Sequence, residues 1–140
     1  SYARGAQEQF LKTAHPVWLS TGQYETWAKE VILPEKYKEV TDRYGDAPGN
    51  LLTTEDSIAI ACLRFGNVLL FPQPRPALGD DDFKLVHGMP VAPPHSYLAP
   101  YLYMQKGFKA DALIHFGTHG NLEYTPGMWA YHRQTGRKHW

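Results

Sequence analysis

The second half of the chain alternates apolar runs with a helical stretch, and this order constrains the fold more than any other feature. Val68–Phe71 and Ala110–Phe116 are apolar runs next to turn residues, so both are typical of short buried strands. Between them lie a proline-rich loop at Gln73–Pro94 and a helical stretch at Pro94–Lys106, which Gly107 is expected to end. This order predicts a βαβ unit with parallel strands and a right-handed crossover.

The first half of the chain favours helices. Helical stretches are predicted at Gly5–Ala14, Gln23–Ile32 and Pro34–Tyr44, and the last of these has a proline in its first turn and Gly45 as a stop. In the later helical stretch, Pro100 is expected to kink the helix or to delay its start. The predicted fold class is therefore α/β, with a helical N-terminal half followed by a βαβ unit that contains a small parallel sheet.

Size and charge exclude several classes of protein. The chain has 140 residues, enough for one domain, and its 14 Lys+Arg balance its 14 Asp+Glu, which argues against a basic nucleic-acid-binding domain. The single cysteine, Cys62, can form neither an internal disulfide nor a cysteine-based zinc site. No apolar stretch approaches the ~18 residues of a membrane span, and no signal peptide is evident. We therefore predict a cytoplasmic protein without a nucleic-acid partner.

The segment most suggestive of chemistry follows the second predicted strand. His115, His119 and Glu123 recur every four residues there, and Gly117 and Gly120 lie between them. The glycines disfavour a regular helix but let the backbone approach a ligand closely. Ligands bind at the carboxyl ends of strands in open α/β sheets. The alternative interpretation is that these are hydrogen-bonded core histidines without a catalytic role.

Other site classes do not fit this segment. A zinc peptidase needs a glutamate directly after the first histidine, where this chain has Phe116. The glycines do not form a phosphate-binding loop, and no serine stands between glycines as in a nucleophile elbow. What remains is a group of two imidazoles and a carboxylate that could bind a metal ion or transfer protons.

The segment His115–Gly127, HFGTHGNLEYTPG, carries a resemblance to a known family. Together with three upstream motifs it resembles the cobaltochelatase large subunit and the porphyrin-binding large subunit of magnesium chelatase. Those motifs are Gly66-Asn67-Val68 leading to Gln73-Pro74, then Pro93-Pro94-His95, and Lys109-Ala110-Asp111-Ala112. Residues 83–88, FKLVHG, are more similar to the haem-uptake branch of the family, whose members are proposed to remove iron from haem.

The resemblance implies a fragment of a tetrapyrrole metal chelatase, because family members are far larger. Residues 1–127 would belong to the large subunit, whereas residues 128–140 do not resemble the family and are expected to be an atypical tail, foreign to the natural protein. The substrates implied are a porphyrin or corrin ring and a divalent metal (Co, Mg or Fe). ATP would act only through partner motor subunits. The alternatives are a haem dechelatase and a non-catalytic tetrapyrrole- or metal-binding module.

The resemblance and the residue types together give a set of candidate site residues. The candidates for catalysis and for metal binding are His115, His119 and Glu123, because imidazole and carboxylate can accept protons and hold a metal ion. The candidates for contact with the tetrapyrrole are His95, His87, Gly117, Gly120 and Asn121. For His95 the alternative is a helix-capping or surface histidine, and for His87 a solvated loop histidine.

Three aromatic side chains near the predicted crossover helix could stack on a macrocycle. They are Tyr97, Tyr101 and Phe108. Aromatic residues on a helix more often belong to the core, so burial is the alternative interpretation for all three.

Overall fold

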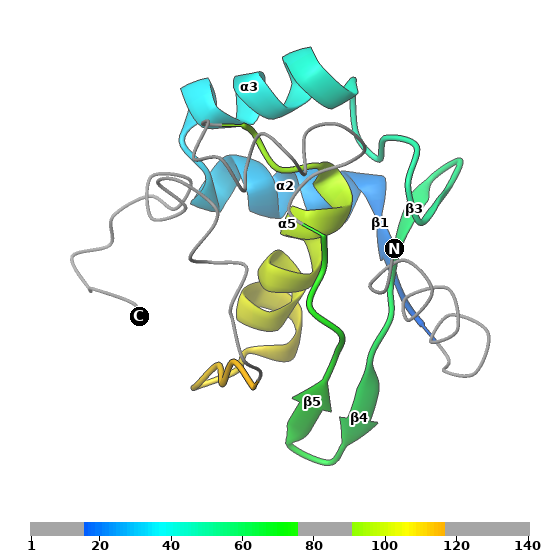
Figure 1. The fold of residues 1–140 in the computed structure, drawn as a ribbon, viewed down its shortest axis with the longest axis vertical. Helices are drawn as coiled ribbons and strands as arrows, with labels where there is room; N and C mark the ends of the chain where they lie inside the picture. The colour runs from blue at the N-terminus through cyan, green and yellow to red at the C-terminus, as the bar shows by residue number, and fades with distance from the viewer. Residues whose placement is uncertain (1–15, 76–90, 117–140) are drawn as a thin grey trace.

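The computed structural model describes residues 16–75 and 91–116 and shows a mixed α/β arrangement. Short antiparallel strands pack with helices that lie before and after most of these strands in the sequence (Figure 1). The elements in chain order are β1 (Val17–Ser20), α2 (Thr21–Val31), α3 (Pro34–Tyr44), β2 (Thr53–Thr54), β3 (Ser57–Ile60), β4 (Leu63–Phe65), β5 (Val68–Leu70), α5 (His95–Leu102) and the π-helix η1 (Tyr103–Phe108).

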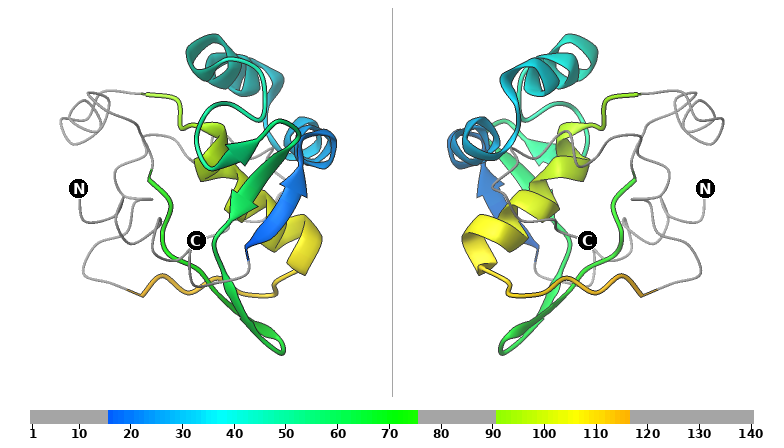
Figure 2. Two further views of the ribbon diagram at one scale, coloured as in Figure 1. Left: turned by 90° about the vertical axis from the view of Figure 1, so that its right-hand side faces the viewer. Right: turned by 90° about the vertical axis from the view of Figure 1, so that its left-hand side faces the viewer.

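The central sheet has the strand order β1-β3-β2, and both pairings are antiparallel. Its register places Val17 opposite Ile60, and Thr53 opposite Ile58. Helix α5 crosses one face of this sheet, behind it in the left view of Figure 2 and in front of it in the right view. The core therefore forms where the sheet meets α5 and α2, with Tyr24 and Tyr97 among its fully buried side chains.

The helices α2 and α3 begin and end at local signals in the sequence. The Ser20 side chain caps α2 by accepting a hydrogen bond from the Gln23 backbone N–H at 3.3 Å. Pro34 occupies the first turn of α3, and Gly45 ends that helix with a φ of 79°. These two helices confirm the helical stretches predicted at Gln23–Ile32 and Pro34–Tyr44.

The helix predicted at Pro94–Lys106 is present but continues further than expected. It begins at His95, so Pro100 does not delay its start, although the missing N–H of Pro100 leaves the Ser96 carbonyl without its usual helical donor. After Leu102 the chain continues as η1 and passes through Gly107. The stop is later than predicted, at Lys109, which adopts the left-handed conformation with a φ of 58°.

Gly107 and Gly22 are both helical glycines, but they differ in the space around them. A Cβ on Gly107 would lie 2.6 Å from Tyr103 Cδ2 and 3.1 Å from Trp27, whereas a Cβ on Gly22 would meet nothing within 4 Å. We therefore expect Gly107→Ala to lower the free energy of unfolding by about 1 kcal/mol through overpacking. The matched change Gly22→Ala should raise it by up to about 1 kcal/mol through helix propensity. Urea denaturation of both variants measures this, and equal effects would contradict the packing argument.

The helical N-terminal half is not confirmed. Among the described residues of that half, β1, β2 and β3 contribute strands as well as the two helices. In β1, Leu19 is buried and Trp18 is largely exposed, which is the alternation of a half-buried strand. Four residues are too few for this alternation to predict a strand from the sequence. The helix predicted at Gly5–Ala14 lies outside the described residues, as does the tail 128–140.

The parallel βαβ unit is also not confirmed. The run at Val68–Phe71 does form strand β5, but β5 pairs antiparallel with β4 in a hairpin that leaves Val68 and Leu70 exposed. Ala110–Phe116 forms no strand, and its side chains are exposed. A strand needs a partner edge for its hydrogen bonds, and in the part of the chain that the structure describes no strand pairs with residues 110–116.

None of the helices in the described ranges has the length and apolar character needed to cross a bilayer.

Candidate functional site

His115 lies on the exposed segment that follows η1. This segment leaves the packed body after Lys109, and the neighbours of His115 are almost fully accessible, Ile114 at 82% and Phe116 at 102%. Residues 16–75 and 91–116 contain no cluster of three His, Cys, Asp or Glu side chains suited to a metal ion. The metal group predicted around His115 therefore stays a prediction.

Most of the other candidate residues lie outside the described residues. This applies to His119, Glu123 and His87, and to the tetrapyrrole-contact candidates Gly117, Gly120 and Asn121. His95 is the second candidate, besides His115, whose surroundings the structure describes.

His95 is buried at the first position of α5 and connects three parts of the fold. Only 2% of it is accessible. Its Nε2 lies 2.9 Å from the Gly45 carbonyl oxygen, and its Nδ1 lies 2.9 Å from the Tyr24 hydroxyl. A carbonyl can only accept, so Nε2 carries a proton and donates to Gly45, and a neutral ring then accepts at Nδ1 from Tyr24. His95 thus joins α5 to α2 and to the end of α3.

The surroundings of His95 favour its neutral form. Burial lowers the pKa of His95, and this outweighs the hydrogen bond to Gly45 and the charges of Glu25 and Asp46, all of which raise it. Burial also holds the pKa of the Tyr24 phenol well above its usual value, so this hydroxyl keeps its proton and can donate. The ring of Tyr37 approaches the imidazole edge-on at 6.2 Å.

We expect this arrangement to make stability depend on pH. In the unfolded chain His95 takes up a proton near its usual pKa of 6.5, whereas the folded protein binds that proton only at lower pH. The unfolded state therefore binds more protons between the two pKa values, and the free energy of unfolding falls as the pH drops through this window. The slope is at most about 1.4 kcal/mol per pH unit. Urea denaturation from about pH 5 to 8, compared with His95→Gln, isolates this contribution. An equal slope in both proteins would contradict it.

The aromatic candidates divide between the core and the surface. Tyr97 and Tyr101 are buried, with ring centroids 5.1 Å apart, and the Tyr101 ring meets Phe71 edge-on at 6.3 Å. These two side chains belong to the core, which was the alternative interpretation of their sequence. Phe108 is half-buried beneath the Arg64 guanidinium, which lies 5.3 Å from the ring centroid. Stacking of Tyr97 or Tyr101 on a macrocycle would require the core to open.

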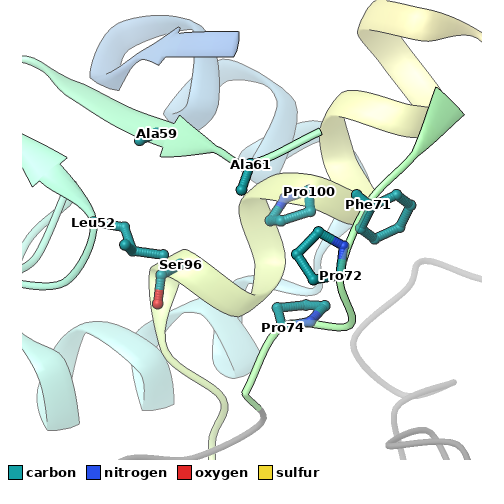
Figure 3. A pocket seen from close by; sticks show the side chains of 8 residues that line it. All are labelled: Leu52, Ala59, Ala61, Phe71, Pro72, Pro74, Ser96 and Pro100. Carbon is teal, nitrogen blue, oxygen red and sulfur yellow. The ribbon is translucent and has the colours of Figure 1, made fainter. Parts of the chain in front are cut away.

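A cavity of about 270 Å³ opens beside the first turn of α5. Arg43 and Tyr44 line it from the last turn of α3, residues 48–51 from the following turn, and residues 94–96 from the start of α5. A smaller apolar crevice of about 20 Å³ lies on the other side of Ser96, against Ala61 and Pro100 (Figure 3). The second space is only large enough for a water molecule.

Sequence reasoning missed the residues of the larger cavity. Residues 46–50 gave a turn signal but no chemistry, and Arg43 is one of many charged helix residues. The motif Pro93-Pro94-His95 marked the start of α5 as part of a site, but it singled out His95 and not Ser96 as the candidate residue. No pattern in the sequence could show that α5 meets α3 and the turn after it, because α5 begins more than 40 residues further along the chain.

Comparison with known proteins gives consistent matches. The family model described as CobN/Magnesium Chelatase matches residues 2–130. The aerobic cobaltochelatase subunit CobN of Sinorhizobium sp. is 34% identical over 110 residues, which is 78% of this chain and 8% of that protein. The chloroplastic magnesium-chelatase subunit ChlH of Oryza sativa subsp. indica is 36% identical over 86 residues, 61% of this chain and 6% of that protein.

A solved structure agrees with these sequence matches. The catalytic subunit of cobaltochelatase from Mycobacterium tuberculosis superposes with a TM-score of 0.66 at 35% sequence identity. The match covers 80% of this chain and 10% of that one. The chain thus spans a tenth or less of the length of each of these proteins.

Proposed function

The chain belongs to the CobN/magnesium chelatase family, and on that basis we propose that it is part of a tetrapyrrole metal chelatase large subunit. In this proposal the complete subunit binds a porphyrin or corrin ring and takes part in inserting a divalent metal, Co, Mg or Fe. The match of the family model to residues 2–130 carries the proposal, because it includes the segment with His115, His119 and Glu123.

The chemistry of metal insertion suits the side chains of this segment. Two pyrrole N–H protons must leave the ring, and water must leave the metal ion. A histidine or a glutamate can accept such protons, and imidazole or carboxylate can hold the ion briefly beside the ring. We assign these tasks to His115, His119 and Glu123. The exposure of His115 supports the assignment, because its ring is accessible to a ligand brought by another part of the subunit.

The remaining candidates would position the ring. Gly117, Gly120 and Asn121 flank the catalytic candidates in sequence, so their backbone and amide groups could contact the macrocycle. His87 would contribute from the loop before α5. Direct contact through His95 would require it to exchange one of its hydrogen bonds, to Tyr24 or to Gly45, for a ligand.

Partners and location follow from the proposed activity. The ring, the metal ion and the remainder of the large subunit would complete the active site, and ATP would be used only by partner motor subunits in a soluble, cytoplasmic complex. The 140 residues of this chain span a tenth or less of the matched relatives, so we expect them to be inactive on their own.

A second candidate function is the removal of iron from haem. Residues 83–88, FKLVHG, are the observation that favours it, because they resemble the haem-uptake branch of the family. Removal reverses insertion: two protons return to the pyrrole nitrogens as the iron leaves. The same proton-transferring side chains would serve, without a motor subunit.

Titration of the full-length protein with haem and with metal-free porphyrins tests the proposal. Absorbance spectra followed over time should show a metal-free ring gaining a metal when ATP, the metal ion and motor subunits are present. Loss of iron from haem without a motor would favour the dechelatase. Stable spectral shifts without any metal transfer would leave only a non-catalytic binding module, and no spectral change with any tetrapyrrole would contradict all three.

A further inference from the structure

We propose that the cavity beside the first turn of α5 is a binding site for an oxyanion, a carboxylate or phosphate group. The cavity is lined by Arg43, Asn50 and Ser96 together with the backbone at the start of the helix. The anion could be a carboxylate side chain of a tetrapyrrole, an identification that rests on the proposed function, or a free small anion.

The first turn of α5 presents unused backbone donors to the cavity. Pro94 precedes the helix and provides no side-chain cap. Its carbonyl accepts from the N–H groups of Tyr97 at 2.9 Å and Leu98 at 3.3 Å. The N–H groups of His95 and Ser96 have no acceptor among the described residues. Because α5 continues directly into η1, its dipole adds to the attraction of a negative group at this end.

Ser96 supplies an independent sign of a ligand. It is only 7% accessible, and its hydroxyl has no hydrogen-bond partner within residues 16–75 and 91–116. It lines the cavity, and in Figure 3 its oxygen points away from Ala61 and Pro100, the apolar side of its surroundings. Serine side chains that are this little exposed are normally hydrogen-bonded. The Ser96 hydroxyl opens onto the cavity that Arg43 and Asn50 also line, so a ligand bound there would supply the missing partner.

The charge and size of the cavity indicate the class of ligand. Arg43 is the cationic side chain in the lining, and a guanidinium has five N–H donors, so it can contact an anion in addition to its other partners, such as the Tyr44 ring at 6.0 Å. Asn50 adds an amide. Asp46 and Glu25 act on His95 from nearby and limit how much negative charge the cavity can take. A volume of about 270 Å³ is below the range of whole-ligand pockets, so it fits a single anionic group rather than a macrocycle.

Titration of the 140-residue chain with inorganic phosphate tests the site directly. Amide NMR shifts of His95 and Ser96 should saturate with phosphate. Ser96→Ala and Arg43→Gln should each weaken binding about tenfold, since each removes a hydrogen bond to a charged group. Lys38→Gln is the matched control, because it removes a positive charge from the exposed part of the same helix and should change the affinity less than about twofold.

Each result of this titration either supports or overturns the site. Shifts that spread over many surface amides, or that weaken equally in Lys38→Gln and Arg43→Gln, would indicate an adventitious ion only and would overturn the proposal. Ser96→Ala removes a hydroxyl without a partner, so its melting temperature should stay close to that of the parent chain. If Arg43→Gln does not fold, Ser96→Ala and Asn50→Ala decide the outcome: both should bind phosphate more weakly than Lys38→Gln does, and equal affinities would overturn the proposal.

The source of the anion is distinguished in the full-length protein. A porphyrin with free carboxylates should compete with phosphate if its side chain is the ligand, whereas its methyl ester should not compete. If neither the porphyrin nor its methyl ester competes with phosphate, and phosphate still binds at Ser96, the site is assigned to a free anion. If phosphate binds at Ser96 and no tetrapyrrole binds anywhere, the proposed function fails and the anion site stands. If tetrapyrroles bind and phosphate does not, only the anion site is overturned.

Discussion

Replacing Glu123 by glutamine in the full-length protein is expected to slow metal transfer about 10²–10⁴-fold while leaving tetrapyrrole binding intact. Glutamine keeps the shape and hydrogen-bonding capacity of the side chain but cannot accept a proton or hold a metal ion as a carboxylate. The expected loss is the usual contribution of general acid–base catalysis. Stopped-flow absorbance of the ring measures the rate, and a titration of the same variant measures binding.

Glu30→Gln provides the matched control for this experiment. Glu30 is a carboxylate of α2 that pairs with Lys106 of η1 and is none of the candidate residues, so its replacement should leave the rate unchanged. If Glu123 only caps a helix or pairs with a cation, its replacement should instead lower stability by about 1 kcal/mol at a near-normal rate. That pattern would remove Glu123 from the catalytic residues and leave His115 and His119.

Replacing His95 by alanine should lower the free energy of unfolding by about 3 kcal/mol. The change removes both of its hydrogen bonds, leaves the Tyr24 hydroxyl and the Gly45 carbonyl without their partner, and opens a cavity between α2 and α5. Denaturant unfolding of the 140-residue chain measures the loss. Tyr24→Phe should lose less, about 1–2 kcal/mol, because only one hydrogen bond is broken.

The double variant separates a structural role of His95 from a role in ligand binding. If His95 and Tyr24 stabilise the fold through their mutual hydrogen bond, His95→Ala combined with Tyr24→Phe should destabilise by less than the sum of the single changes. Additive losses would contradict the coupling. A loss below about 1 kcal/mol for His95→Ala, together with weaker tetrapyrrole binding in the full-length protein, would assign His95 to the ligand instead.

Local signals predicted the helices of the described residues well. The bounds of α3 follow from Pro34 at its start and Gly45 at its end, and both residues act through their own backbone preferences. The start of α5 after Pro94 is set in the same way. Such signals operate within one turn of helix, so they are visible in the sequence without knowledge of the rest of the fold.

Pairing between distant segments could not be predicted. The apolar runs at Val68–Phe71 and Ala110–Phe116 indicated buried strands, but burial depends on a partner surface that an apolar pattern does not identify. The described residues place the first run in an exposed hairpin and the second in no strand. His95 was recognised as a candidate from its motif, but its role depends on Tyr24 and Gly45, which only the folded chain brings together.

The position of β3 between β1 and β2 has a consequence for the order of folding. The pairing of β2 with β3 spans a tight turn and can form early, because closing a short loop loses little chain entropy. The pairing of β1 with β3 must enclose all of residues 21–56, and α5 reaches the sheet only after an excursion of similar length, over residues 61–94. The transition state for folding should therefore contain the β2–β3 turn with α2 and α3, and the rate should be limited by the arrival of β1 and α5.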